Sequence, residues 1–275
     1  NPRIQKHSKY FTSDHIKNIY LEKEKVPDSL RGQMNNIYPL FWMAENILEY
    51  NPLPLLIGGG FGSANIVNIN DYLSIGEQSH QTILILAGDI GSFYQIKQLR
   101  LFLQECSRYY YAVLYIPGNH EYYIRYKYNV LSFEILYNRL IDMVNSIDNV
   151  ILLNKSIMKI KEYVFIGCTL WSYANILPKK RVKIHGLTRD DYNDMHQSDI
   201  EFLNKSLNKF KNNTCIVITH HAPTYKLLSK RKLHDKFSDL YASNSDFLFK
   251  QCIKYWIYGH THDNIELIEN GVHII

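Results

Sequence analysis

Four short apolar runs stand out in the hydrophobic pattern of the chain. They cover residues 83–87, 112–116, 215–218 and 255–258, and they are rich in β-branched and aromatic side chains. Continuous runs of this length and composition are typical of β-strands that are buried on both faces. Each run stops where a polar segment begins, so the pattern predicts four strands that end in carboxylate, carboxamide and imidazole groups.

Further elements follow from the spacing of apolar positions elsewhere in the chain. Apolar side chains recur every three or four positions over residues 91–107, 132–145 and 199–211, which predicts three helices. Three more strands are predicted, over residues 150–153, 157–160 and 164–167. Strands and helices therefore alternate from about residue 53 onward, and this alternation predicts an α/β fold.

The N-terminal part of the chain differs from the rest. Residues 1–50 are rich in Lys, Asn, Glu and Tyr, with only weak helical periodicity. We expect them to form a separate N-terminal segment, followed by one main domain over residues 51–275. The chain begins without Met and ends on residues 272–275, an apolar run that resembles an interrupted strand. We therefore expect the main domain to be truncated at its C-terminus.

The polar segments that follow the four strands share metal-binding residue types. They are residues 88–89, 118–121, 219–221 and 259–262. In an α/β sheet, groups at the carboxyl ends of strands lie where such folds bind and react. The four segments therefore predict one shared site, although they lie far apart in the chain.

The residue types in these segments indicate a site for two cations. The Asp89 carboxylate can bridge two metal ions through its two oxygens. Imidazole groups suit borderline transition metals, and a carboxamide adds a neutral oxygen ligand. The predicted ligands are Asp89, Asn119, His220, His260 and His262. These donors accept manganese, iron or zinc, so we expect up to two divalent ions of one of these metals.

Such a site indicates phosphoester chemistry. Two cations roughly 3.5–4 Å apart clamp a phosphoryl group and lower the pKa of a shared water, which makes hydroxide available near neutral pH. His120 directly follows Asn119, so its side chain points elsewhere and can protonate the leaving alkoxide. We predict hydrolysis of phosphate mono- or diesters by a metal-activated hydroxide, with His120 as the catalytic acid.

In these segments the chain resembles the calcineurin-like metallophosphoesterase superfamily, whose signature has five blocks. The last four blocks, G-D, G-N-H-[ED], H-x and G-H-x-H, are present in order, and the resemblance runs from about Leu53 to the C-terminus. Residues 167–172 and 191–195 also resemble intervening segments of one bacterial and viral branch. The resemblance implies a four-layer α/β/β/α sandwich with two mixed sheets.

The first block of the family, D-x-H, is missing. On the best alignment Glu45 stands in place of the aspartate and Ile47 in place of the histidine, while Asp14 and His15 lack the spacer between them. The resemblance implies that the lost pair serves the cation that His262 also binds. The other four predicted ligands serve the second cation. Glu45 is therefore a candidate additional ligand.

Two questions stay open at the level of sequence. His221 is a further candidate, which could bind the other metal, contact phosphate or cap the loop. The degenerate first block also leaves an alternative to the enzyme, a weakened or inactive family member that acts as a binding or scaffold module. Two tightly held ions support the enzyme, and one or none supports the scaffold.

Composition excludes several classes of protein. Apolar residues form 46% of the 275, which excludes a disordered chain. No run of eighteen apolar residues is present, and the polar N-terminus does not resemble a signal peptide. The four cysteines have no C-x-x-C spacing, so we expect buried free thiols. A cytoplasmic protein without membrane contact is the resulting expectation.

The charge balance bears on the substrate. The net charge of +5 is consistent with an anionic substrate, either a small phosphate ester or a phosphoprotein. Two basic clusters, at residues 179–183 and 230–232, flank the predicted site in sequence, and a solvated loop face is the commoner fate of such runs. No extended basic stripe follows a backbone, which disfavours a nucleic-acid partner.

Three other features have a structural interpretation. The glycines of residues 58–62 lack the spacing of a phosphate loop and indicate a flexible turn. The tyrosines of residues 122–128 could stack on a nucleotide, but we favour amphipathic side chains near the surface. His80, His185 and His196 have no partners by spacing, so we expect them at the surface.

Overall fold

The computed structural model of the chain describes residues 42–43, 55–58, 79–124 and 130–275. The predicted N-terminal segment therefore lies outside the described residues apart from Trp42 and Met43, and so do Glu45 and Ile47. None of the described helices combines the length and apolar character that crossing a bilayer requires.

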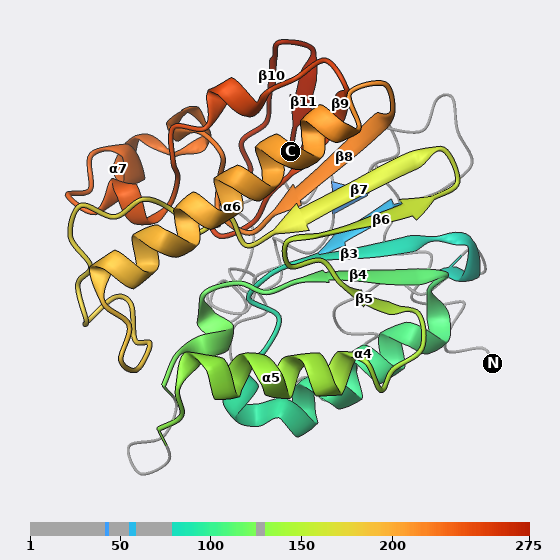
Figure 1. The fold of residues 1–275 in the computed structure, drawn as a ribbon, viewed down its shortest axis with the longest axis horizontal. Helices are drawn as coiled ribbons and strands as arrows, with labels where there is room; N and C mark the ends of the chain where they lie inside the picture. Colours follow the sequence, from blue (N-terminus) through green and yellow to red (C-terminus); the bar gives the residue numbers. More distant parts are fainter. Residues whose placement is uncertain (1–41, 44–54, 59–78, 125–129) are drawn as a thin grey trace, which may run out of the picture.

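The main chain forms two sheets that both contain a parallel core (Figure 1). The first sheet has five strands, in the spatial order β1 (Trp42–Met43), β2 (Leu55–Gly58), β3 (Ile83–Ala87), β4 (Ala112–Ile116) and β5 (Val150–Leu152). Strands β2 to β5 are parallel, and β1 is antiparallel to β2. This sheet is therefore mixed.

The second sheet has six strands. Their order is β10 (Leu267–Glu269), β11 (Val272–Ile274), β9 (Ile253–Ile257), β8 (Thr214–Thr219), β7 (Tyr163–Cys168) and β6 (Ser156–Ile160). The four central strands are parallel, and the two edge strands run antiparallel to their neighbours. Two mixed sheets were predicted, and both are present.

Helices cover the outer faces of the sheets. Helices α4 (Ile96–Tyr109) and α5 (Phe133–Val144) pack on the first sheet, and α6 (Arg189–Lys209) packs on the second (Figure 1). The two sheets face each other between these helices. The predicted four-layer α/β/β/α sandwich is therefore confirmed.

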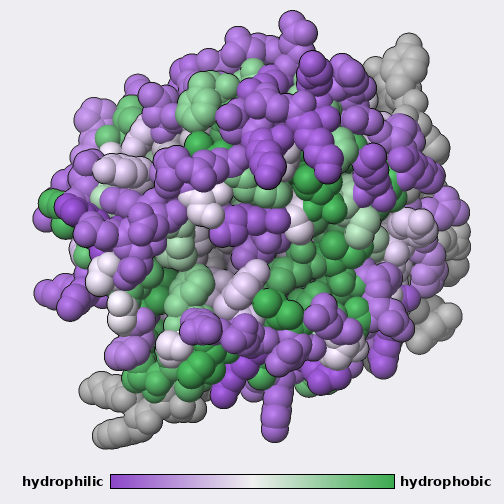
Figure 2. Space-filling model, in the orientation of Figure 1, coloured by the Kyte–Doolittle hydropathy of each residue, from purple (hydrophilic) through white to green (hydrophobic). Residues whose placement is uncertain are grey.

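Three apolar clusters hold the layers together, and alternation along the strands divides the side chains among them. In β3, Ile83 and Ile85 join the cluster between the two sheets, whereas Leu84 and Leu86 pack under the helices. Both faces of this strand are buried, which explains its unbroken apolar sequence. On one face of the molecule, apolar side chains reach the surface over the edge strands β5 and β6 (Figure 2).

The three predicted helices are present, but they differ in how closely their first residues match the prediction. Helix α5 begins where predicted, because the Ser132 hydroxyl caps it by accepting from the Ile135 amide. Helix α4 begins at Ile96, after a 3-10 turn over Phe93–Gln95. Helix α6 begins ten residues earlier than the predicted 199, because its first turns are polar and carry little apolar periodicity.

The segment between β8 and β9 contains short helical turns instead of one long helix. They are Tyr225–Leu227, α7 (Lys230–Leu233), Ser238–Leu240 and Asp246–Leu248. The segment from Thr169 to Thr188 connects β7 to α6. In the described part of the chain, both segments leave the carboxyl ends of second-sheet strands and lie at the same end of the molecule (Figure 1).

Candidate metal centre

The four polar segments converge at one place. They follow β3, β4, β8 and β9, whose carboxyl ends lie side by side at the facing edges of the two sheets. Asp89, His220 and His260 each offer a ligand atom, and these atoms all lie within 4.8 Å of one another. These residues come from three strand ends, so the fold gathers side chains that the sequence separates by up to 171 positions.

His220 lies at the centre of the group. Its Nε2 atom is 3.0 Å from Asn119 Oδ1, 3.2 Å from His260 Nδ1 and 3.4 Å from Asp89 Oδ1. The His220 side chain is fully buried, and those of Asp89 and Asn119 are nearly so. Four donor atoms therefore meet at one place, three of them on buried side chains and the fourth on the half-buried His260.

Backbone carbonyls fix the tautomers of both imidazoles. His220 Nδ1 lies 2.8 Å from the Ala87 carbonyl oxygen, and His260 Nε2 lies 3.0 Å from that of Leu240. A carbonyl only accepts hydrogen bonds, so each of these nitrogens carries the proton in the neutral ring. The opposite nitrogens then direct their lone pairs at the place where the four atoms meet, which is the usual outer arrangement around metal-binding histidines.

The Asn119 carboxamide is oriented in the same way. Its Nδ2 group donates a hydrogen bond of 2.7 Å to the Tyr123 hydroxyl, so Oδ1 faces His220. With both imidazoles neutral, two oxygens and two nitrogens would meet with no hydrogen between them. Such a group is mutually repulsive unless a metal cation or a proton on His220 Nε2 lies among the lone pairs. The residues therefore fit a divalent metal ion.

The protonation tendencies agree with this fit. Burial opposes ionisation of Asp89, but the adjacent His220 holds the pKa of Asp89 well below its usual value. Burial alone would lower the pKa of His220, yet the Asp89 charge raises it. Burial and the neighbouring His221 and His220 keep the pKa of His260 well below its usual value. An ionised carboxylate beside a neutral imidazole draws positive charge into the centre.

His120 lies beside the centre. Its backbone amide donates a hydrogen bond of 2.9 Å to Asp89 Oδ1, and its half-buried ring stacks on Tyr123 with 4.4 Å between ring centroids. The predicted catalytic acid is therefore adjacent to the ligand group but is not part of it. The stacking and the backbone bond together fix where the imidazole lies.

Glu121 has a role that the sequence did not reveal. This carboxylate is fully buried and accepts hydrogen bonds from the amides of Asp89, Ile90 and Gly118 and from the Tyr115 hydroxyl. Burial raises the pKa of Glu121 to about 8, and the Asp89 charge acts in the same direction. Glu121 thus ties the loop after β3 to the loop after β4.

His221 is buried behind the ligand group. Its ring lies between those of Trp171 and His260, with centroids 5.7 and 4.2 Å away. Its Nδ1 atom is 3.4 Å from the Thr169 carbonyl oxygen, and among the described residues its Nε2 atom has no hydrogen-bond partner. Burial holds the pKa of His221 well below its usual value, so the ring is neutral.

His262 differs from the other predicted ligands because its side chain is exposed. Its donor atoms are not among those of the three-residue group around His220. In the described part of the chain, four predicted ligands therefore come together, and the fifth, His262, lies on the exposed side of the centre.

The backbone of the centre is conformationally demanding. The backbone φ angles of Asp89, His260 and His262 are 58°, 65° and 53°. These values lie in the left-handed region, which residues other than glycine adopt infrequently. A Cβ atom on Gly118 would lie 2.3 Å from Asp89 Oδ1, so no larger residue fits there. The chain therefore passes close to its own ligands.

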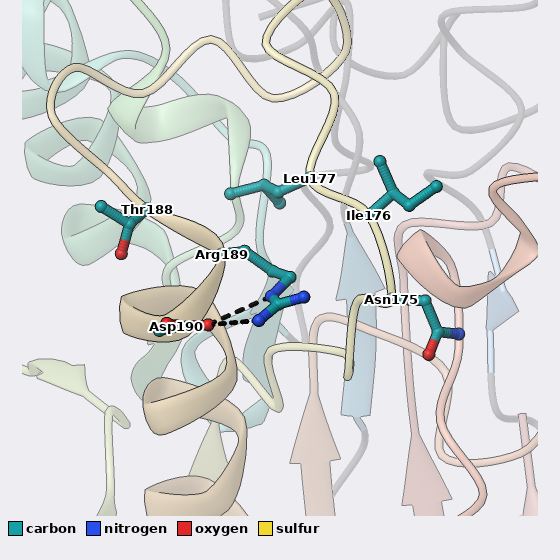
Figure 3. A pocket seen from close by; sticks show the side chains of 6 residues that line it. All are labelled: Asn175, Ile176, Leu177, Thr188, Arg189 and Asp190. Atoms are coloured by element: carbon teal, nitrogen blue, oxygen red, sulfur yellow. Dashed lines mark hydrogen bonds and ion pairs between the residues drawn. The ribbon is translucent and has the colours of Figure 1, made fainter.

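A surface hollow lies between the two ends of the segment that connects β7 to α6. It has a volume of about 410 Å³ and is lined by Asn175, Ile176, Leu177, Thr188, Arg189 and Asp190. The Arg189 guanidinium extends across it and bonds Asp190 (Figure 3). The Asn175 amide donates to Asp239, which connects this hollow to the segment that carries Leu240.

Two interpretations of surface residues need correction. Tyr122 is buried against Phe93 and Phe133 in the first apolar cluster, and Tyr123 supports Asn119, so neither is the surface tyrosine expected from sequence. His196 is half-buried, and its Nδ1 atom bonds the Trp171 carbonyl. For His196 the reason is the packing of α6 on the loop that carries Trp171, and for the two tyrosines it is contact with Phe93, Phe133 and Asn119; neither kind of contact is encoded in a local sequence pattern.

Comparison with known proteins adds three findings. A family model for calcineurin-like phosphoesterases matches residues 36–264. An uncharacterized protein of Acanthamoeba polyphaga mimivirus is 30% identical over 211 residues, which cover 69% of this chain and 75% of that protein. The structure of phosphopantetheinyl hydrolase from Mycobacterium tuberculosis is 16% identical with a TM-score of 0.60, over 81% of this chain and 88% of that one. This last likeness shows the fold.

Proposed function

Because the chain belongs to the calcineurin-like phosphoesterase family, we propose that it is a metal-dependent hydrolase of phosphate mono- or diesters. A divalent cation, when bound, polarises a phosphoryl group and lowers the pKa of water. Asp89, Asn119, His220 and His260 would hold such a cation. Manganese, iron and zinc all suit this set of oxygen and nitrogen donors.

One observation carries this proposal. The lone pairs of four donor atoms, three on buried side chains and one on the half-buried His260, point to one place, and the Ala87 and Leu240 carbonyls hold both imidazoles in the tautomers that this requires. A structural histidine pair in a core would instead share a proton or bond other side chains. The two backbone carbonyls that orient the imidazole lone pairs are therefore what supports metal binding here.

His120 would act on the leaving group. Its ring is close to the ligand group yet half-exposed, so it can reach a bound ester and exchange protons with solvent. A proton given from the imidazole to the departing alkoxide oxygen makes that oxygen a neutral alcohol. The Tyr123 stack keeps the ring in place for this transfer.

A second candidate function has its own support. His262 is exposed and lies apart from the three-residue group, so the described part of the chain gathers the donors of one cation. A single tightly held cation is what a weakened family member, acting as a binding module, would retain. The first hypothesis requires that a second cation bind with His262 and with residues outside the described part, where Glu45 is a candidate.

Metal analysis and turnover separate the two functions. We expect purified protein loaded with manganese to hydrolyse p-nitrophenyl phosphate or bis(p-nitrophenyl) phosphate. His120→Asn should lower kcat by about 10²-fold with an unchanged metal content, because general acid catalysis contributes about that much. His80→Asn, at an exposed site just before β3, is the matched control.

The outcomes are distinct. Absence of turnover with every divalent ion, together with one bound ion for each chain, would favour the binding module. The double variant with Glu45→Asp and Ile47→His restores the first block of the family. An increase in both turnover and the number of bound ions would show that the enzyme is active but weakened.

A further inference from the structure

Positive charge is concentrated in two segments of the chain. Residues 177–187 and 229–237 contain eight Lys and Arg residues and one acidic residue, so these 20 residues carry a net charge of +7. The whole chain carries +5, so the other 255 residues together carry −2. The excess positive charge of the protein therefore belongs to these two segments, which we call the basic rim.

The two segments lie against each other in space. An ion pair of 2.8 Å joins Arg181 to Asp235, and the Arg181 guanidinium also lies over the Phe237 ring at 4.6 Å. Some fifty residues separate these positions in the sequence. Figure 1 shows that the loop before α6 and helix α7 occupy the same end of the molecule, and Figure 2 shows hydrophilic residues over much of that end.

Local packing directs the cations outward. Val182 and Ile184 are buried in the first apolar cluster, while the alternating neighbours Arg181 and Lys183 are exposed. Of the eight cations, one is buried and the others are exposed; the exposed set is Lys179, Lys180, Arg181, Lys183, Lys230, Arg231 and Lys236. The buried neighbours therefore hold the backbone of the rim in place, and the exposed cations extend from it into solvent.

The rim borders the metal centre. The buried Lys232 forms an ion pair of 2.7 Å with Asp263, which directly follows His262. The Leu240 carbonyl, three residues beyond the second rim segment, bonds His260. A long anion that lies along the rim would thus extend to the donors of the centre.

The hollow between Asn175 and Asp190 adds a site for an uncharged group. Ile176 and Leu177 give it an apolar wall, and the Arg189 guanidinium presents a planar cation beside it (Figure 3). Its volume of about 410 Å³ is open to solvent, so a planar group can enter it from outside. Nucleic-acid bases stack on apolar and guanidinium surfaces of this kind.

We propose that the basic rim binds a single-stranded nucleic acid, with one base in the hollow and a backbone phosphate at the metal centre. The inference rests on the proposed function and deepens it by naming a class of substrate. It departs from the expectation that nucleic acid is an unlikely partner, because the two basic clusters that are separate in sequence lie together in space. One phosphate monoester carries at most two charges, which a metal centre already neutralises. Seven exposed cations, of which Arg181 is paired with Asp235, in segments that adjoin the hollow match a repeating polyanion that also carries bases.

Binding is tested without turnover. Fluorescence anisotropy of labelled oligodeoxynucleotide and oligoribonucleotide strands, in EDTA, gives the affinity as a function of salt concentration. We expect tighter binding at low salt for at least one of the two strands. The triple variants Lys179→Ala/Lys180→Ala/Lys183→Ala and Lys230→Ala/Arg231→Ala/Lys236→Ala should each weaken binding about tenfold. Each should also reduce the slope of log K against log salt by about 2, since each phosphate contact contributes about 0.7.

The control variant removes three exposed lysines from the other end of the sheets, as Lys161→Ala/Lys205→Ala/Lys211→Ala. It should leave the affinity unchanged. Equal loss in the control and rim variants would overturn the proposal, and so would equal affinity for inorganic polyphosphate, which has no bases. Because EDTA removes the cation, failure here is independent of p-nitrophenyl phosphate hydrolysis, which tests the proposed function by itself.

Discussion

His220 and Asn119 face each other across 3.0 Å with two atoms that both carry lone pairs, Nε2 and Oδ1. Neither atom has a proton to donate when the His220 proton is on Nδ1, opposite the Ala87 carbonyl. The contact is favourable only with a positive charge between or beside the two atoms. This relationship, with the equivalent one to His260, leads to the first two predictions.

Metal binding should stabilise the fold. A ligand at a free concentration 100 times its Kd adds about 2.7 kcal/mol to the free energy of unfolding, so manganese should raise the Tm of the protein. His260→Ala should abolish the increase because it removes one of the four donors. Differential scanning calorimetry measures both. An exposed control, His80→Ala, should keep the full increase; loss of the increase in that variant would contradict the assignment.

The two imidazoles should have opposite tautomers. The carbonyls of Ala87 and Leu240 place the proton of His220 on Nδ1 and that of His260 on Nε2. Long-range proton–nitrogen NMR spectra of the zinc-loaded protein, which is diamagnetic, distinguish the two forms. Observation of the same tautomer for both rings would show that one of the carbonyl bonds is absent.

Glu121 should be a major source of stability. Glu121→Ala leaves three backbone amides and the Tyr115 hydroxyl buried with no acceptor. An unsatisfied buried donor costs about 1–3 kcal/mol, so we expect a loss of at least about 3 kcal/mol in urea unfolding. Glu134→Ala, at an exposed position of α5, is the control and should change stability by less than about 0.5 kcal/mol. A small loss in the Glu121 variant would show that these loops are held by other contacts.

Gly118 should be intolerant of any side chain. The Cβ of Gly118→Ala would lie 2.3 Å from Asp89 Oδ1 and 2.7 Å from His220 Cε1, so both ligands must move. We expect manganese affinity in calorimetric titration to fall by at least about tenfold, as for other changes around metal ligands. In Gly91→Ala the nearest atom is the flexible end of Leu99, 3.1 Å away, and affinity should be retained.

Asp199 should give stability a defined pH dependence. Burial raises its pKa from 3.8 to about 6, against the Trp171 amide that bonds it. Between these values the native state holds a proton that the unfolded state has lost. Stability therefore falls as pH rises from about 4 to 6, by ~3 kcal/mol at most, and is level above.

The variant Asp199→Asn keeps an oxygen for the Trp171 amide and has no ionisable group. Its free energy of unfolding should lack this fall between pH 4 and 6, and near pH 7 the variant should be at least as stable as the natural chain. Urea unfolding at several pH values measures the difference. Parallel curves for the two proteins would show that the carboxyl is ionised in the native state throughout.

Sequence predicted the parts of the fold that depend on local pattern. Strand β3 was evident because both of its faces are buried, which leaves no polar position in the run. Asp89, Asn119, His220 and His260 were evident because each directly follows such a strand, and parallel strands place their carboxyl ends together. These four side chains lie close together because of the strand order of the sheets, so no side-chain contact had to be known to predict the site.

Other features depend on contacts between distant segments, and no local pattern encodes them. Glu121 accepts hydrogen bonds from amides 31 and 32 residues away in the chain. The sequence around Glu121 therefore showed only that it belongs to a family motif. Helix α6 begins early because Thr188 and Asp191 form a capping box ahead of a polar face. Arg181 and Asp235 join two basic clusters that appear independent when read along the chain.

The left-handed backbone at Asp89, His260 and His262 has an evolutionary consequence. Each of these residues costs folding free energy in a conformation that glycine or asparagine adopts more readily. A lineage released from holding a cation would gain robustness by drifting to those two amino acids at all three positions. Glycine or asparagine at these positions, with the core strands kept, is thus the change we expect in a descendant whose centre no longer binds a cation.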